Sequence, residues 1–148
     1  MTNALNLYLA NLAVWNVKLH NLHWNVVGPM FKPVHEYTES LYDEAFEAYD
    51  AVAEVLKMRG EMPLCSMKDY LAVATVKEVE ARAYSCCEVV GMVREDMELM
   101  LNLAKEIRKA AADADDFQVQ AMFEGFMEGF VKQLWFIDAM QQGATCSK

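Results

Sequence analysis

All three histidines of this chain lie in one short stretch. His20, His23 and His35 fall within VKLHNLHWNVVGPMFKPVHE, residues 17–36, which also contains Trp24. Imidazole is a common ligand of iron and other transition metals. In a chain of 148 residues, this clustering indicates a candidate metal site.

Carboxylates follow the histidines with helical spacing. At 100° per residue, and with His35 at zero, Glu39 lies at about 40°, Asp50 at about 60° and Glu54 at about 100°. By themselves these carboxylates would be a solvated acidic stripe. Together with imidazole they form a ligand set that suits iron.

The familiar metal motifs are absent from the sequence. His35-Glu36 is followed by Tyr37, Thr38 and Glu39, so there is no HExxH, and none of the three histidines has a glutamate three residues before it. The usual di-iron site inside a helical bundle uses a Glu-x-x-His pair on each of two helices. The sequence therefore disfavours an intrasubunit di-iron oxidase.

Helix geometry offers another arrangement. His23 and His35 flank the breaker pair Gly28-Pro29, so they lie near the same end of an antiparallel hairpin and can converge. Asp50 and Glu54 are one turn apart, but Asp50 lies about 22 Å along the helix from His35. One ion cannot bind both pairs in one subunit. A two-fold axis would place the histidines of one subunit against the carboxylates of its mate, twice over.

The elements that must position these residues are helices. A heptad pattern predicts a helix over residues 3–27, and Gly28-Pro29 ends it. Further helices are predicted over residues 33–59 and 75–112, the latter opening on a capping box of Thr75 and Glu78. A connection of about 15 residues carries a short helix at 66–73, and a last helix ends near Gly143. Four long helices with this crossover predict an all-α, ferritin-like four-helix bundle.

Composition and charge narrow the functional class. A formal net charge of −9 and a pI near 4.7 disfavour nucleic acid and anionic membranes as partners and favour cations. No apolar run reaches the length of a membrane span, and no leader is evident, so we expect one cytoplasmic domain, residues 1–148. The four cysteines have no zinc spacing and are expected to be buried, reduced thiols.

Motifs along nearly the whole chain point to one family. They are HWNVxGPxF from His23, His35-Glu36, Leu41-Tyr42, DxxAE from Asp50, GxxP from Gly60, KxYL from Lys68 and KxxW from Lys132. This set strongly resembles the Dps family of mini-ferritins.

The resemblance implies an iron-storing, hollow dodecamer with a ferroxidase centre between subunits. There Fe(II) is oxidised, preferentially by hydrogen peroxide and more slowly by dioxygen, and Fe(III) is stored in the cavity, which protects against oxidative stress. Carried over by position, the iron ligands are His23 and His35 from one subunit and Asp50 and Glu54 from the other.

The resemblance also assigns residues around the ligands. Glu39 stands where the family often has a further carboxylate, and Trp24 lies beside the centre. His20 is expected to support the ligands, with direct iron binding or proton transfer as the alternative. A catalytically idle shell or DNA-compaction protein of the same fold is the rival interpretation, but it should have lost a ligand, and this chain has lost none.

The chain departs from the family in two places. The first basic residue is Lys18 and the last segment, QQGATCSK, offers only Lys148, so DNA binding through a basic tail is not expected. At the start of the last helix the acidic pattern of the iron-entry pore is changed. The candidates that could supply the negative field there are Asp113, Asp115, Asp116 and Glu124.

Overall fold

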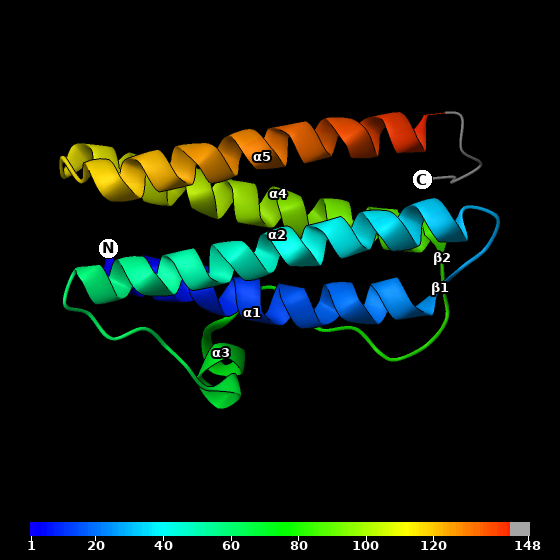
Figure 1. The fold of residues 1–148 in the computed structure, drawn as a ribbon, viewed down its shortest axis with the longest axis horizontal. Coiled ribbons are helices and arrows are strands. Elements are labelled where there is room, and N and C mark those ends of the chain that lie inside the picture. The colour runs from blue at the N-terminus through cyan, green and yellow to red at the C-terminus, as the bar shows by residue number, and fades with distance from the viewer. Residues whose placement is uncertain (143–148) are drawn as a thin grey trace.

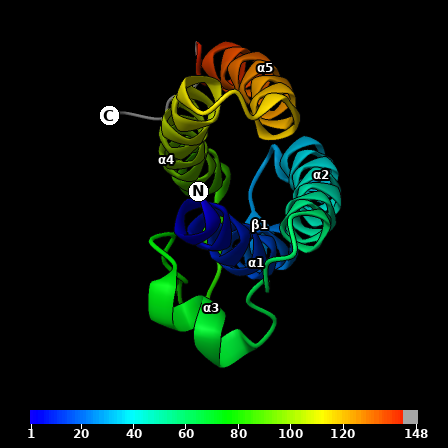
Figure 2. The ribbon, with the colours of Figure 1, turned by 90° about the vertical axis from the view of Figure 1, so that its left-hand side faces the viewer.

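The computed structural model describes residues 1–142 as an all-α, ferritin-like bundle, as predicted. The long helices are α1 (Thr2–Asn25), α2 (Phe31–Met58), α4 (Cys86–Asp113) and α5 (Phe117–Gln141). The helices pair as two hairpins, α1 with α2 and α4 with α5, and the end-on view shows all four around a common centre (Figures 1 and 2). The crossover between the hairpins carries α3 (Met67–Val73), which lies outside the bundle against α1.

Helix α1 contributes most to the core. Its heptad residues Leu5, Leu12 and Leu19 are fully buried, and so is Tyr8 on the interleaved row. On α5, Phe123 packs edge-on against Tyr8 with ring centroids 4.8 Å apart. The predicted inner rows therefore face the core, and burial of these apolar side chains is the main stabilising contribution.

The first hairpin turns two residues earlier than predicted. Helix α1 ends at Asn25, and Val26–Val27 form the strand β1. Gly28 has φ 123°, a conformation that other residues rarely adopt, and α2 then begins at Phe31, two residues before the expected start at Pro33. Strand β1 pairs in parallel with β2 (Tyr84–Ser85), which ties the turn to the end of the crossover.

Asparagine side chains of α1 hold the crossover. The Oδ1 atom of Asn6 accepts from the amide of Leu64 at 2.8 Å. Buried Asn11 accepts from the amides of Thr75 and Val76 and donates to the Thr75 hydroxyl at 3.0 Å. These bonds satisfy backbone amides in the irregular stretches on either side of α3.

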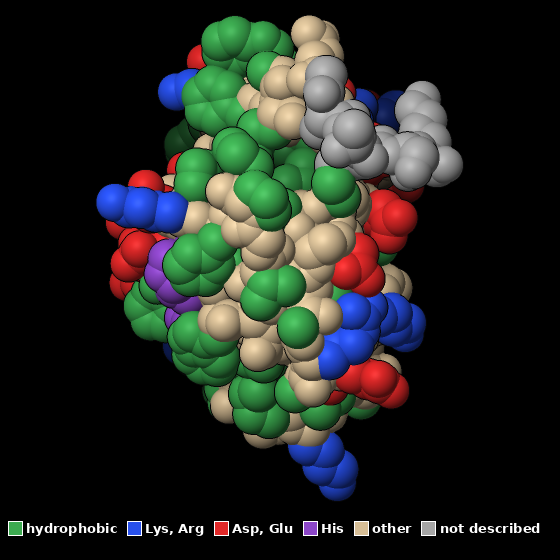
Figure 3. All heavy atoms as spheres, turned by 90° about the vertical axis from the view of Figure 1, so that its right-hand side faces the viewer, with side chains coloured by type: hydrophobic (Ala, Val, Ile, Leu, Met, Phe, Trp, Pro, Cys, Tyr) green, Lys and Arg blue, Asp and Glu red, His purple; other side chains and the backbone are tan. Residues whose placement is uncertain are grey.

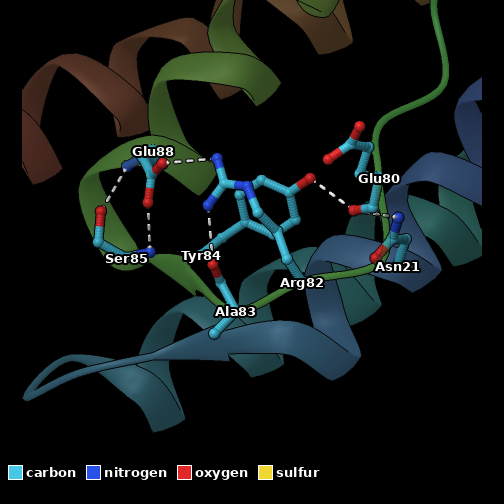
Figure 4. A network of polar contacts seen from close by, with 7 residues as sticks. All are labelled: Asn21, Glu80, Arg82, Ala83, Tyr84, Ser85 and Glu88. Atoms are coloured by element: carbon cyan, nitrogen blue, oxygen red, sulfur yellow. Dashed lines mark hydrogen bonds and ion pairs between the residues drawn. The ribbon is translucent and has the colours of Figure 1, made fainter.

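The predicted start of the third long helix is wrong. Thr75 bonds to Asn11 instead of capping a helix, and α4 begins only at Cys86. The capping box is formed by Ser85 and Glu88, which bond each other's backbone amides (Figure 4). Arg82 pairs with the Glu88 carboxylate at 2.9 Å and covers the Tyr84 ring. The crossover is therefore about ten residues longer than the sequence pattern indicated.

The other element ends agree closely with the predictions. Ser66 caps α3 and Asp116 caps α5. The expected stop at Gly143 lies outside the described residues. Among residues 1–142, no helix combines the length and the apolar character needed to cross a membrane.

The cysteine prediction is wrong on burial, and it is wrong on the reduced state of Cys87, which is disulfide-bonded. Cys65 is an exposed free thiol, Cys86 is a half-buried free thiol that donates to the Val27 carbonyl, and Cys87 lies on the surface. Cys146 lies outside the described part of the chain.

Candidate metal centre

His23 and His35 meet where α1 and α2 join. Their imidazole rings stack with centroids 3.6 Å apart and planes 18° apart. Each ring bonds the other residue's backbone: His23 Nδ1 lies 2.8 Å from the His35 carbonyl oxygen, and His35 Nδ1 lies 2.8 Å from the His23 carbonyl oxygen. The hairpin thus fixes both rings through one reciprocal pair of bonds.

This reciprocal bonding sets the protonation of both rings. A carbonyl oxygen only accepts hydrogen bonds, so each Nδ1 must carry the hydrogen. In the neutral rings, each Nε2 then keeps its lone pair, and neither Nε2 bonds to another residue within 1–142. Metal-binding histidines in proteins are commonly held in this way by a carbonyl on the other ring nitrogen.

Thr38 supports this arrangement, although the sequence interpretation gave it no role. Its side chain is fully buried. Its hydroxyl oxygen lies 2.9 Å from the His35 carbonyl oxygen and 3.3 Å from His23 Nδ1. The sequence spacing could have indicated this role, because a residue three positions after a helical histidine lies on the same face of the helix.

His20 lies beside the pair rather than in it. Its Nδ1 donates to the Asn16 carbonyl at 2.8 Å, and its ring stacks on Tyr42 at 3.8 Å. The Tyr42 ring also meets His23 edge-on at 5.2 Å. Tyr42, unassigned from the sequence, thus links His20 to the candidate ligand His23.

Two further residues predicted near the site lie close to this cluster. Trp24 is 69% exposed, and its ring is 5.5 Å from that of His20. Burial, followed by the charge of Glu39, raises the pKa of Tyr42. Glu39 itself is exposed one turn after His35, so its carboxylate is accessible to a cation.

Asp50 and Glu54 are separate from the histidines in this chain. Both are exposed on α2, more than four turns beyond His35, and neither makes a hydrogen bond or ion pair with the rest of residues 1–142. Within that same range, no three His, Cys, Asp or Glu side chains converge closely enough to hold a metal. The predicted ligands therefore form two separated groups in one chain, the candidate half-sites of the predicted metal centre.

Exposed apolar side chains lie near both candidate half-sites. Trp24, Val27, Met30 and Phe31 are exposed near the histidines, and Phe46, four residues before Asp50, is 63% exposed. Figure 3 shows histidine atoms reaching the surface between hydrophobic side chains, with acidic side chains alongside. Clustered apolar side chains with this exposure are typical of a protein interface.

The predicted pore residues lie around the α4–α5 turn. Asp113 pairs with Lys109, Asp116 pairs with Arg59, and Glu124 pairs with Arg108. Asp115 occupies the turn with φ 54°. Because three of the four carboxylates have a basic partner in the chain, their negative field is weakened, and a pore role stays a prediction.

The family model and the sequence relatives agree on the kind of protein that this chain resembles. The Ferritin-like domain family matches residues 2–145. A "DNA protection during starvation protein" of Brevibacillus brevis is 36% identical over 135 residues, which cover 91% of this chain and 90% of that protein. "DNA protection during starvation protein 2" of Bacillus anthracis is 33% identical over 91% of this chain and 92% of that protein.

Solved structures agree with the sequence relatives. A Dps protein from Bacillus brevis superposes with a TM-score of 0.91 at 35% identity and covers 95% of this chain and 94% of that one. Antigen TpF1 from Treponema pallidum gives a TM-score of 0.92 at 28% identity, with 95% and 90% covered.

Proposed function

The chain belongs to the Dps family of ferritin-like proteins, and from that premise we propose that it oxidises and stores iron at a centre shared between two subunits. The His23 and His35 rings of one subunit and the Asp50 and Glu54 carboxylates of its mate would bind Fe(II). Storage of the Fe(III) product protects the cell from oxidative stress.

The observation that carries this proposal is the reciprocal bonding of His23 and His35. It leaves an Nε2 donor on each of two stacked rings, and no third ligand joins them from residues 1–142. Two imidazoles alone bind Fe(II) weakly and do not compensate the added charge of Fe(III). Two carboxylates from a second subunit supply that charge, so the completed site suits both oxidation states.

The proposed oxidant is hydrogen peroxide, with dioxygen as a slower alternative. One peroxide molecule accepts one electron from each of two Fe(II) ions and, with two protons, yields two water molecules and two Fe(III) ions. Because both electrons are taken together, no hydroxyl radical is released. Glu39, one turn after His35, and His20, one turn before His23, would bind iron or transfer protons during this step.

The proposed assembly is a hollow homo-oligomer, with a dodecamer as the family form. Its two-fold dimer would bury the apolar side chains around the two half-sites and join those half-sites at the same time. The cytoplasmic location and the single-domain boundary of residues 1–148 stay predictions.

A direct test follows Fe(II) oxidation after peroxide is added under anaerobic conditions. His23→Ala and Asp50→Ala should each lower the initial rate at least about tenfold, because each removes a ligand of the same site. Glu61→Ala, which removes an exposed carboxylate outside both half-sites, should retain the wild-type rate. Size-exclusion chromatography must show that every variant is assembled. Wild-type rates for both ligand variants would refute the site.

Mixed oligomers test whether the site is shared. When His23→Ala and Asp50→Ala chains are unfolded, mixed and reassembled, each mixed dimer has one intact site and one site with both defects. With random pairing, half of the dimers are mixed, so about a quarter of wild-type activity should return. If each site lay within one chain, no activity would return.

The rival function is a shell or DNA-compaction protein without catalysis. It predicts that wild type oxidises Fe(II) no faster than peroxide does without protein. The retention of all four candidate ligands favours the ferroxidase, because a structural shell has no need to hold two imidazoles with their Nε2 atoms free.

A further inference from the structure

Two cysteines begin α4, at the end of the bundle that carries the candidate histidine ligands. Cys86 and Cys87 directly follow strand β2, which pairs with β1 in the turn between His23 and His35 (Figure 1). The Cys86 thiol donates to the Val27 carbonyl at 3.4 Å. The two sulfurs therefore lie next to this turn, although the proposed iron centre makes no use of them.

The two neighbouring sulfurs are in different states. Cys87 is exposed and disulfide-bonded, whereas Cys86 is half-buried and keeps its thiol. Cys65, on the far side of the crossover in sequence, is an exposed free thiol. Exposure alone therefore does not explain which of these cysteines is oxidised.

The fold keeps Cys86 out of a bond with its neighbour. Consecutive Cα atoms are about 3.8 Å apart, below the roughly 4.4–6.8 Å that a disulfide spans, so a ring between Cys86 and Cys87 would be strained. The Cys86 sulfur is instead engaged at the turn, where it bonds the Val27 carbonyl and lies 3.6 Å from the place of a Cβ added to Gly28. Cys87 is thus the sulfur of this pair that meets molecules from solvent.

The start of α4 is held by contacts other than the disulfide. Ser85 and Glu88 form the capping box, and Arg82 pairs with Glu88 and covers the Tyr84 ring (Figure 4). Strand β2 is also paired with β1. These contacts are independent of the sulfur of Cys87, so its disulfide can open and close without unfolding the helix.

An exposed disulfide of this kind is typical of a redox-active site. In the cytoplasm, where we predict the protein to act, thiols are kept reduced, and the disulfides that do form are usually transient and serve catalysis or redox sensing. Exposed disulfides are also among the more easily reduced. The first turn of a helix favours a thiolate, the form of cysteine that attacks peroxide, and Arg82 offsets the charge of neighbouring Glu88.

We propose that Cys87 is a reversible, peroxide-reactive site that consumes peroxide without iron. The Cys87 thiolate attacks one peroxide oxygen, the O–O bond breaks, and the sulfenic acid and a hydroxide form; the hydroxide takes a proton and becomes water. A second thiol then attacks the sulfenic sulfur, and its oxygen leaves as a second water. Two thiols are oxidised to one disulfide and one peroxide is reduced to two water molecules. Cellular thiols such as glutathione reverse the bond by exchange.

The test uses assembled, full-length protein that has been freed of iron with a chelator, reduced, and then treated with hydrogen peroxide. Thiol titration of unfolded samples should fall from the four thiols of the sequence to two, and glutathione should restore all four. Peptide mapping without reduction should find Cys87 in the new disulfide, identify the sulfur joined to it, and find Cys86 as a thiol. A disulfide that glutathione does not open, or a Cys87 that stays reduced after peroxide, would overturn the proposal.

Cys87→Ser and Cys65→Ser separate this site from general thiol oxidation. Cys87→Ser should lose thiols at least about tenfold more slowly than wild type, because the reactive sulfur is gone. Cys65→Ser, which removes an exposed free thiol, is the matched control and should still lose two thiols per chain. Equal rates of thiol loss in Cys87→Ser and wild type would overturn the proposal.

Iron oxidation provides the independent readout. Both cysteine variants should oxidise Fe(II) at the wild-type rate, because neither residue is a candidate iron ligand. Conversely, His23→Ala should retain the wild-type loss of thiols in iron-free protein. Failure of the iron centre and failure of the thiol site therefore appear in different measurements.

Discussion

At the scale of single residues, the candidate centre depends on which nitrogen of each imidazole is engaged. The two carbonyl bonds of His23 and His35 engage both Nδ1 atoms, and the two rings stack with centroids 3.6 Å apart. The sequence predicted that the two histidines converge. It did not predict the reciprocal bonding, because that depends on the turn bringing each ring within 2.8 Å of the other residue's carbonyl.

Thr38→Val should slow iron oxidation without unfolding the protein. Valine has nearly the same shape as threonine but lacks the hydroxyl that lies 3.3 Å from His23 Nδ1. Loss of a group that supports metal ligands typically costs about tenfold or more in activity or affinity. Initial rates with peroxide measure this effect. Ser40→Ala, which removes an exposed hydroxyl from the same helix, is the control and should retain the wild-type rate.

At the scale of elements, periodicity predicted the helices well and their ends less well. The segments Thr75–Glu78 and Ser85–Glu88 both match a capping box, and the sequence alone does not distinguish them. The structure uses the second because Asn11, 64 residues away in sequence, binds Thr75. Similarly, the pairing of β1 with β2 joins residues 58 positions apart, so no local pattern reveals it.

Asn11→Ala should release the crossover from α1. The substitution leaves the amides of Thr75 and of buried Val76 without their acceptor. Such a loss costs about 2 kcal/mol, or about 30-fold in the local opening equilibrium. Hydrogen exchange of these two amides measures it. Asn102→Ala, at an exposed position of α4, should leave their exchange unchanged.

The Ser85–Glu88 capping box should make stability depend on pH. Arg82 and then the Ser85 amide lower the pKa of Glu88 from 4.5 to about 2. Because the folded chain favours the carboxylate, this contribution is present above pH 4.5 and is lost as the pH falls toward 2. Thermal unfolding at a series of pH values should show a shallower decline for Glu88→Gln than for wild type in this window.

A control and the salt dependence define this test. Glu106→Gln removes an exposed carboxylate of α4 that has no ion pair within the described chain, and it should follow the wild-type curve. Since Glu88 is exposed, added salt should reduce the difference between wild type and Glu88→Gln. Parallel curves for these two proteins at low salt would show that the capping carboxylate contributes no pH dependence.

At the scale of the whole molecule, the proposed two-fold dimer would explain both the exposed apolar side chains and the separation of the candidate ligands. If the proposed dimer covers the apolar side chains near both candidate half-sites, the formation of the interface and of the iron centre would be the same event. The sequence predicted this coupling from the distance of about 22 Å between His35 and Asp50. It could not predict the surface around them, which depends on how the helices rotate against one another.

The net charge of the assembly should prevent nonspecific DNA binding. Each chain carries −9, and every added copy increases the repulsion of phosphate, whose neutralisation by basic residues drives such binding. In a gel-shift assay with plasmid DNA at physiological salt, we expect no retardation at protein concentrations that give full Fe(II) oxidation. A variant with four lysines added at the N-terminus is the positive control, and its shift should weaken as salt rises. Retardation by the unmodified protein at physiological salt would show that a local basic surface overcomes the net charge, and protection of DNA would then involve contact as well as removal of iron and peroxide.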